Sequence, residues 1–261
     1  MSLKLTILGC GTSSGVPRIG NDWGDCDPNE PRNRRSRASI LVESPTTRLL
    51  IDTSPDMRAQ LLAADVIQID AILWTHDHAD HSHGLDDVRQ LYHYRRTPVP
   101  GYARRETLTL LSQRFSYAFE GRNGYHPTIE PHVLPDGLRI GDIDITCTDQ
   151  PHGDIFSTGF RFGHGGRSIG YATDFHALTP GMIALYDRLD VWVVDALREK
   201  PHPTHPHLAL TLDGIAAVGP ARAILTHMDQ SMDYATLRRT LPPGVEPGYD
   251  GMVVQLDGEG G

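Results

Sequence analysis

Ten residues at positions 75–84, THDHADHSHG, hold four histidines and two aspartates directly after the apolar run Ala71–Trp74. A short apolar run that ends in polar residues predicts a buried strand followed by a loop. Imidazole and carboxylate groups bind zinc, manganese or iron, whereas a set without thiolates makes a poor structural zinc site. The stretch therefore predicts a catalytic metal site at the end of a strand.

The chain has 261 residues, 39% of them hydrophobic, which is enough for one large domain with a substantial core. No apolar run approaches the roughly 20 residues that span a bilayer, and the start of the chain lacks the apolar centre of a signal peptide. We therefore expect a cytoplasmic protein without a membrane partner. A net charge of −9 also argues against a long nucleic-acid partner, which would need many Lys and Arg side chains.

Apolar and alternating segments predict strands along the whole chain, with helices between them. The expected strands are 3–8, 38–43, 48–51, 71–74, 143–148, 157–162, 168–172, 191–194, 221–225 and 252–256. The expected helices are 55–64, 84–95, 104–119, 179–189, 210–218 and 234–240. Because strands and helices alternate in both halves, the chain is expected to form α/β layers.

Six titratable residues follow the predicted strand ends: Asp52, His76, His152, Asp174, Asp195 and His227. In α/β folds this edge of the sheet is where loops converge and ligands bind. The loop at positions 75–84, called the histidine loop below, can turn His76 and His78 toward one ion and Asp80 and His81 toward a second. His152, Asp174 and His227 would complete the two spheres, with a carboxylate as the bridge. His83 fits no ligand position, and we expect it to lie behind the ligands or in solvent.

The motif Thr75-His76-Asp77-His78-Ala79-Asp80-His81, followed by His152, Asp174 and His227, resembles the metallo-β-lactamase superfamily. The closer resemblance is to the phosphoribosyl cyclic phosphodiesterases of phosphonate breakdown. It depends on the histidine motif and on three further segments, Gly9-Cys10-Gly11-Thr12-Ser13-Ser14-Gly15-Val16-Pro17, Leu85-Asp86-Asp87 and Tyr249-Asp250-Gly251-Met252.

The resemblance implies a four-layer αββα sandwich over residues 1–261, with two divalent ions, zinc or manganese, at the carboxyl edge of the strands. It implies one metal on His76, His78 and His152, the other on Asp80, His81 and His227, and Asp174 between them. Asp52 resembles an aspartate that supports the histidine loop from outside the coordination spheres. Some relatives carry a cysteine-rich zinc knuckle, but residues 21–31 here offer only Cys26, so we expect no such knuckle.

Hydrolysis of a phosphodiester needs a proton donor for the leaving oxygen, and a histidine outside the metal ligands suits this role. We expect His207 to be this acid, with His202 and His205 as alternatives. For the substrate phosphate we expect contacts from Arg34 and Arg35, within the cationic run 32–37, because guanidinium matches phosphate geometry. Ser13 and Ser14 are expected to offer further contacts.

The sequence thus predicts a dinuclear hydrolase of a small phosphodiester, such as a phosphoribosyl cyclic phosphate or a nucleotide-like molecule, with a homodimer possible. Three alternatives stay open. A thioesterase or lactonase would use the same metals on a carbonyl carbon. A ribonuclease Z-like enzyme would need a surface that grips tRNA, which the negative charge disfavours. A metal-dependent ligand sensor would keep the site without turnover.

Overall fold

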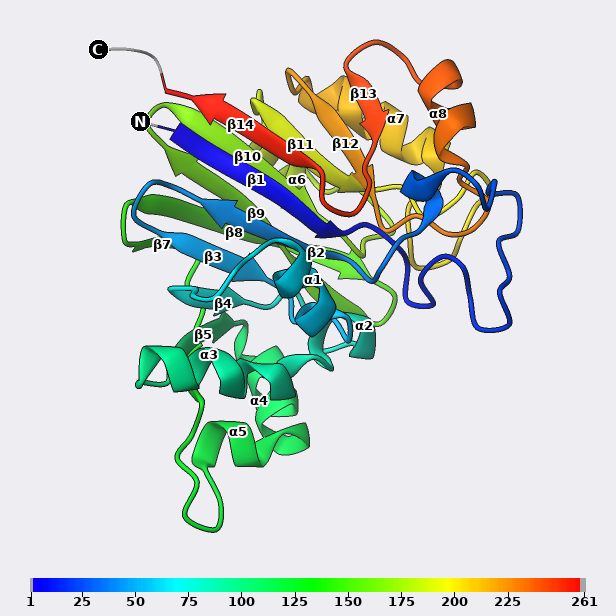
Figure 1. The fold of residues 1–261 in the computed structure, drawn as a ribbon. Coiled ribbons are helices and arrows are strands. Elements are labelled where there is room, and N and C mark those ends of the chain that lie inside the picture. Colours follow the sequence, from blue (N-terminus) through cyan, green and yellow to red (C-terminus); the bar gives the residue numbers. More distant parts are fainter. Residues whose placement is uncertain (1, 259–261) are drawn as a thin grey trace.

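The computed structural model describes residues 2–258, which form two seven-stranded sheets packed face to face (Figure 1). The first sheet has the order β14-β1-β2-β3-β4-β5-β6. Its strands are β1 (Ser2–Gly9), β2 (Ser39–Glu43), β3 (Arg48–Ile51), β4 (Ala71–Leu73), β5 (Val99–Ala103), β6 (Ile129–Val133) and β14 (Val253–Asp257). From β3 to β6 the neighbours are parallel, which brings the carboxyl ends of β3 and β4 to one edge.

The second sheet has the order β13-β12-β11-β10-β9-β8-β7. Its strands are β7 (Gly137–Ile140), β8 (Ile143–His152), β9 (Ile155–His164), β10 (Arg167–Ala172), β11 (Val191–Asp195), β12 (Ala223–Thr226) and β13 (Val245–Pro247). Strands β7 to β10 form an antiparallel meander, and β10 to β13 are parallel.

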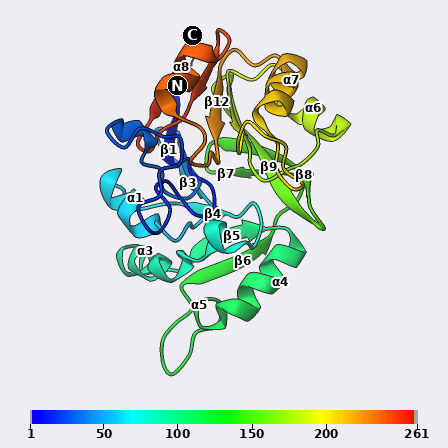
Figure 2. The same cartoon turned by 90° about the vertical axis from the view of Figure 1, so that its right-hand side faces the viewer.

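Helices cover the outer faces of both sheets, so that the layers follow the expected αββα order (Figure 2). On the first sheet lie α1 (Met57–Ala63), α2 (Ala79–Ser82), α3 (Val88–Arg95), α4 (Arg105–Arg114) and α5 (Ser116–Glu120). On the second lie α6 (Pro180–Tyr186), α7 (Leu208–Val218) and α8 (Tyr234–Thr240), and two short 3-10 turns occupy Pro31–Asn33 and Leu85–Asp87. None of the helices in residues 2–258 is long and apolar enough to span a bilayer.

The central strands bury both faces, which explains their continuous apolar sequences. In β3, Leu49 and Ile51 point into the core between the sheets, whereas Leu50 points into a second core beneath α1 and α3. After β4, Trp74 fills this second core and donates its indole N–H to Thr53 Oγ1 at 2.9 Å. The histidine loop therefore starts from a residue that is held by packing and by a hydrogen bond.

All ten predicted strands are present, β3 with the predicted bounds and the other nine with shifted ends. Four more strands, β5, β6, β7 and β13, were not predicted. The strand expected to end at Thr148 continues to His152, which is its last residue. The two long helices expected near 84–95 and 104–119 are each interrupted. The first starts with a 3-10 turn before α3, and the second breaks at Phe115 between α4 and α5.

Candidate metal centre

The strand ends of both sheets bring the predicted ligands to one edge of the sandwich. Asp52 directly follows β3, and His76 comes three residues after the end of β4. His152 ends β8, Asp174 comes two residues after β10, and His227 directly follows β12. Asp52, Asp174 and His227 have left-handed backbones, with φ of 64°, 59° and 57°. Such strained backbones on residues other than glycine persist where the surrounding structure enforces them, and they gather at functional sites.

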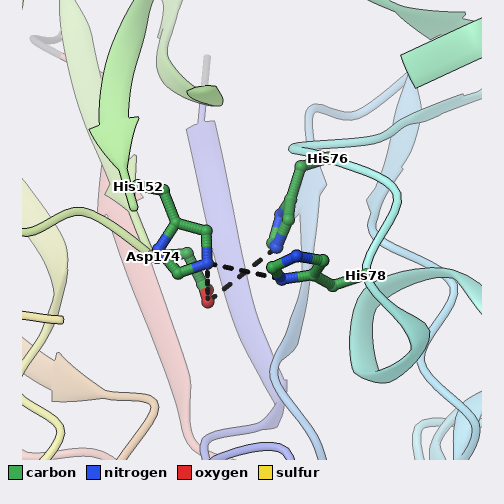
Figure 3. Close-up of side chains that lie close together, drawn as sticks. All are labelled: His76, His78, His152 and Asp174. Atoms are coloured by element: carbon green, nitrogen blue, oxygen red, sulfur yellow. Dashed lines mark hydrogen bonds and ion pairs between the residues drawn. The ribbon is translucent and has the colours of Figure 1, made fainter. Parts of the chain in front are cut away.

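Three histidines and one carboxylate oxygen converge in the first group, drawn in Figure 3. His152 Nε2 lies 3.3 Å from His78 Nδ1 and 3.6 Å from Asp174 Oδ1. His76 Nε2 lies 3.9 Å from the same Asp174 oxygen. These atoms come from the histidine loop after β4, the end of β8 and the turn after β10, so the group joins the two sheets.

The second group uses the other oxygen of Asp174. His81 Nε2 lies 3.1 Å from Asp174 Oδ2 and 3.3 Å from Asp80 Oδ2. His227 Nε2 lies 3.5 Å and 3.4 Å from the same two oxygens. Each oxygen of Asp174 thus faces a different set of ligands, which is the arrangement of a bridging carboxylate.

The spacing and chemistry of both groups fit divalent metal ions. A tetrahedral ion with ligands at about 2.1 Å separates its ligand atoms by about 3.4 Å, close to the separations found here. Among the described residues, the buried Nε2 atoms of His76 and His81 make no hydrogen bond of good geometry, although carboxylate oxygens lie 3.1 to 3.9 Å away. Buried polar atoms are normally hydrogen-bonded, so the placement of these nitrogens fits metal ligands.

Hydrogen bonds outside the two groups orient the imidazoles. His81 Nδ1 lies 2.8 Å from Asp52 Oδ2, and His152 Nδ1 lies 2.9 Å from the carbonyl oxygen of Thr204. When Nδ1–H donates to such an acceptor, the lone pair on Nε2 is free for a metal. Asp52 also accepts from the backbone N–H of Thr75 at 2.8 Å, so one carboxylate braces both the loop and its histidine.

The electrostatics of the cluster favour a cation. Burial raises the pKa of Asp174, but His227 and His81 hold it well below its usual range. Burial lowers the pKa of His227, but Asp174 and Asp195 outweigh burial and raise it to about 9. The carboxylate of Asp174 is therefore kept ionised by the histidines around it. Because metal ligands must be deprotonated, metal uptake at this cluster is coupled to proton release.

His205, one of the two stated alternatives to His207, lies at the rim of the centre. The ring of His205 stacks on that of His227, with centroids 4.9 Å apart, and its Nδ1 lies 3.2 Å from Asp195 Oδ2 and 3.7 Å from Asp174 Oδ1. His205 thus forms, with Asp174, Asp195 and His227, a third group of ligand atoms close enough to hold a metal ion. His207 is the N-cap of α7, makes no side-chain capping bond, and is absent from the described ion clusters and from the cavity at the centre. The ring of the other alternative, His202, packs against the ring of His205, with centroids 5.1 Å apart, and His202 does not line the cavity.

A cavity of about 400 Å³ opens at the metal centre. It is lined by Ser13, His78, Asp80, His152, Gly153, Asp154, Ile155, Asp174, Thr204, His205 and His227. Ser13 therefore lines the cavity at the metal centre. Ser14 and Arg34 line a different groove, of about 740 Å³, between α1 and the strands β1 and β2.

The expected substrate contact from Arg35 needs correction, because this side chain is 2% exposed and already engaged. Its guanidinium donates to the carbonyl oxygens of Asp229 and Met232 and to Asn33 Oδ1. Arg35 thus ties the first loop to the segment after β12. Arg34 stacks on Trp23, with its guanidinium carbon 5.0 Å from the ring centre, and does not reach the metal cavity.

Two contributors to the site were not assigned from the sequence. Asp195 accepts the backbone N–H of Asp174 at 2.9 Å and faces His205, so it braces the turn that carries the bridge. Its position at a strand end was visible in the sequence, but no role followed from it. Thr204 contributes through its carbonyl oxygen, which no side-chain pattern reveals.

Comparison with known proteins agrees with this geometry. A family model described as a Beta-lactamase superfamily domain matches residues 47–228, more than half of the chain. A crystal structure described as a new diphosphatase from the PhnP family superposes with a TM-score of 0.90 at 35% identity, covering 98% of both chains. Zn²⁺-bound PqqB from Methylobacterium extorquens has a TM-score of 0.76 at 17% identity, with 96% of this chain and 99% of that one covered.

Among curated proteins, the octanoyltransferase of Porphyromonas gingivalis (strain ATCC BAA-308 / W83) is 31% identical over 268 residues. The match covers 99% of this chain and 52% of that protein, so the chain spans about half the length of this relative. The family model and the PhnP-family structure confirm the resemblance noted from the histidine motif. The chain belongs to the metallo-β-lactamase superfamily of hydrolases and lies near its PhnP branch.

Proposed function

We propose that this protein is a dinuclear metal-dependent phosphodiesterase that hydrolyses a small phosphodiester, such as a phosphoribosyl cyclic phosphate or a nucleotide-like molecule. One observation carries the proposal. The two oxygens of Asp174 face two separate sets of ligand atoms, 3.6 and 3.9 Å from His152 and His76 on one side and 3.1 and 3.5 Å from His81 and His227 on the other. The 35% identity to a PhnP-family diphosphatase supports the phosphoryl chemistry.

The residues would divide between two ions. His76, His78, His152 and Asp174 Oδ1 would hold one ion, and Asp80, His81, His227 and Asp174 Oδ2 the other. When bound, two such ions lower the pKa of water and clamp the oxygens of a displacement at phosphorus. Zinc or manganese, the two metals expected from the sequence, both accept this set of imidazole and carboxylate ligands.

The protein's own part in the reaction is orientation and proton transfer. His205 is the proton donor for the leaving oxygen, since it lines the cavity and belongs to neither of the two ligand sets proposed for the ions. Asp195 Oδ2, 3.2 Å from His205 Nδ1, orients the ring. Asp52 and Thr204 fix the rings of His81 and His152. Ser13 offers its hydroxyl to a phosphate oxygen.

Among the described residues, the cavity itself offers no permanently cationic side chain to the phosphodiester group that would be cleaved. None of the residues that line it, all of them within the described 2–258, is a lysine or an arginine. A phosphodiester carries a single negative charge, which the metal ions would neutralise without help from cationic side chains. The expected cytoplasmic location and the possible homodimer stay predictions.

The test compares substrates on metal-replete protein. We expect hydrolysis of bis(p-nitrophenyl) phosphate and of a ribose cyclic phosphodiester, and loss of both activities after chelation. Under the same conditions we expect a p-nitrophenyl thioester and a lactone to react much more slowly. Faster turnover of the thioester or lactone would assign the site to carbonyl chemistry, and binding without turnover of any substrate would favour a ligand sensor.

A further inference from the structure

The end of α4 contacts the histidine loop from outside the metal centre. Helix α4 belongs to the group of helices beside β5 and β6, in the lower part of Figure 1. Its last residue, Arg114, and the following Phe115 each contact a different end of the segment that carries the metal ligands. Neither residue lines the metal cavity.

Arg114 binds the residue between two of the ligands. Its guanidinium donates to the carbonyl oxygen of Asp77 at 2.5 Å and to Asp77 Oδ2 at 2.9 Å. Asp77 separates His76 from His78, both of the first ligand group. The hydroxyl of Ser82 donates to the same Asp77 carbonyl at 3.1 Å and to the His78 carbonyl at 2.8 Å. The peptide between the two histidines is thus fixed from inside the loop and from α4.

Phe115 contacts the other end of the loop. Its ring packs edge-on against the ring of His83, with centroids 5.5 Å apart, within the range of aromatic pairs. His83 ends the four-residue helix α2, which carries Asp80 and His81. His83, the one histidine of the loop that is not a proposed ligand, therefore packs against the end of α4 instead of facing the metal centre.

The loop needs support of this kind. Helix α2 has only four residues, and its N-cap residue, His78, makes no side-chain capping bond. Helices this short are not stable by themselves, so tertiary contacts must fix their position. Metal ligands need positions accurate to a fraction of an ångström, and partners outside the coordination sphere supply this accuracy.

We propose that Arg114 is a positioning residue, which through its paired contacts with Asp77 holds His76 and His78 in the geometry that binds the first metal ion. The inference depends on the proposed dinuclear site. According to this inference, α4 helps to position the metal ligands, although no proposed ligand lies on this helix. A lysine could not replace this arginine fully. The planar guanidinium places two N–H groups on the carbonyl and the carboxylate of Asp77 at once, whereas a single ammonium group cannot bind both in this geometry.

The chain offers a matched control on the same helix. Arg104, the N-cap residue of α4, also donates to acceptors on other segments: Asp149 Oδ1 and Asp136 Oδ1, both at 2.8 Å, and the carbonyl oxygen of Leu134 at 3.1 Å. Its contacts lie away from the histidine loop. Arg104→Ala therefore removes carboxylate and carbonyl contacts comparable to those of Arg114 from the same helix, without removing a contact to the histidine loop.

The experiment measures metal retention in competition with a chelator, by metal analysis, for wild type, Arg114→Ala, Arg114→Lys and Arg104→Ala. For Arg114→Ala we expect one of the two ions to be held at least tenfold more weakly, as for other supports of metal ligands. Arg114→Lys should recover only part of this loss, and Arg104→Ala should match wild type. The Co²⁺ absorption spectrum should change only in the Arg114 variants. Thermal unfolding of the metal-free variants should stay close to wild type, because half-exposed ion pairs contribute little stability.

The outcomes separate this inference from the proposed function. If wild type never binds more than one ion per chain, the dinuclear proposal fails. If wild type binds two ions and Arg114→Ala holds both as tightly as wild type does, Arg114 is not a positioning residue. Equal weakening in Arg114→Ala and Arg104→Ala would also overturn the inference, because the cause would then be a general loss of helix packing.

Discussion

His205 Nδ1 lies 3.2 Å from Asp195 Oδ2, while its ring stacks on the ring of His227. Asp195 is the last residue of β11 and is completely buried, so its carboxylate is fixed by the sheet. His205 comes from the loop before α7 and is half-buried at the cavity. This pair gives His205, which lies outside the two proposed ligand sets, a fixed orientation at the cavity.

We predict that His205→Ala selectively slows reactions with poor leaving groups. A general acid contributes roughly 100- to 10,000-fold, and its effect is largest when the leaving oxygen needs a proton. Hydrolysis of a ribose cyclic phosphodiester should fall by this amount, whereas bis(p-nitrophenyl) phosphate should be little affected. Metal content should stay unchanged. The matched control is His207→Ala, two residues away, which should resemble wild type on both substrates. Similar losses on both substrates would contradict the acid role of His205.

The metal ligands could be predicted because their positions follow from strand ends. Asp174 and His227 are far apart in the sequence, yet each lies within two residues of the end of an apolar run that forms a central strand. Central strands have long apolar sequences, and their carboxyl ends meet at one edge, so pattern alone brings these residues together. The choice between His205 and His207 could not follow from pattern. It depends on a loop whose path is set by backbone bonds such as Leu208 N to the Arg198 carbonyl.

The strands that were not predicted lack a continuous apolar run. Three of the four, β6, β7 and β13, are edge strands, which are partly exposed and tolerate proline. The fourth, β5, contains Pro100 and Gly101, both typical of turns. Gly101 is needed there because a Cβ atom would lie 2.6 Å from the ring of Trp74. In β5, tertiary packing therefore determines the strand, although Pro100 and Gly101 by themselves favour a turn.

Arg35 shows a similar limit of sequence reasoning. A run of arginines in an acidic protein predicts an anion site when burial is unknown. The structure uses Arg35 to satisfy two carbonyl groups inside the protein, and it points Arg34 to a tryptophan. Burial of single members of a charged run cannot be read from composition.

We predict that Asp174→Asn reduces metal binding below two ions per chain and lowers phosphodiester turnover by orders of magnitude. An amide presents only one oxygen, so it cannot face both ligand groups as the carboxylate does. The substitution is nearly isosteric, and the fold should persist. Metal analysis and circular dichroism test both parts. Wild-type metal content with wild-type turnover would show that Asp174 is not the bridge.

Two neighbouring serines give a matched pair for substrate binding. Ser13 lines the metal cavity, and Ser14 lines the groove beside α1. A hydrogen bond to a charged group contributes about 1.5–3 kcal/mol, so Ser13→Ala should raise KM roughly tenfold or more with little change in metal content. Ser14→Ala should leave KM unchanged. Steady-state kinetics on the cyclic phosphodiester measure both, and a larger effect from Ser14 would move the substrate toward the groove.

Asp250, in the Tyr249-Asp250-Gly251-Met252 motif, makes the stability of the protein depend on pH. Its carboxylate accepts the backbone N–H of Cys10 at 3.1 Å and the backbone N–H and hydroxyl of Ser36 at 2.7 and 2.6 Å. It thus joins the end of the chain to the first loop and to the arginine run. Burial raises the pKa of Asp250 from 3.8 to about 6, although the hydrogen bonds from Ser36 oppose this change.

Because this pKa is higher in the folded than in the unfolded state, the contribution of Asp250 to stability is fully present below pH 3.8 and is lost as the pH rises through about 6. A single group can lower the free energy of unfolding by at most about 1.4 kcal/mol per pH unit in this window. We predict that Asp250→Asn removes this component of the pH dependence.

Ser36→Ala removes a hydrogen bond that favours the ionised carboxylate, so it should raise the pKa of Asp250 and move the loss of stability to higher pH. Urea unfolding of metal-free protein between pH 4.5 and 8 measures these slopes. If the slopes of wild type and Ser36→Ala coincide across this range, Asp250 is not the titrating group.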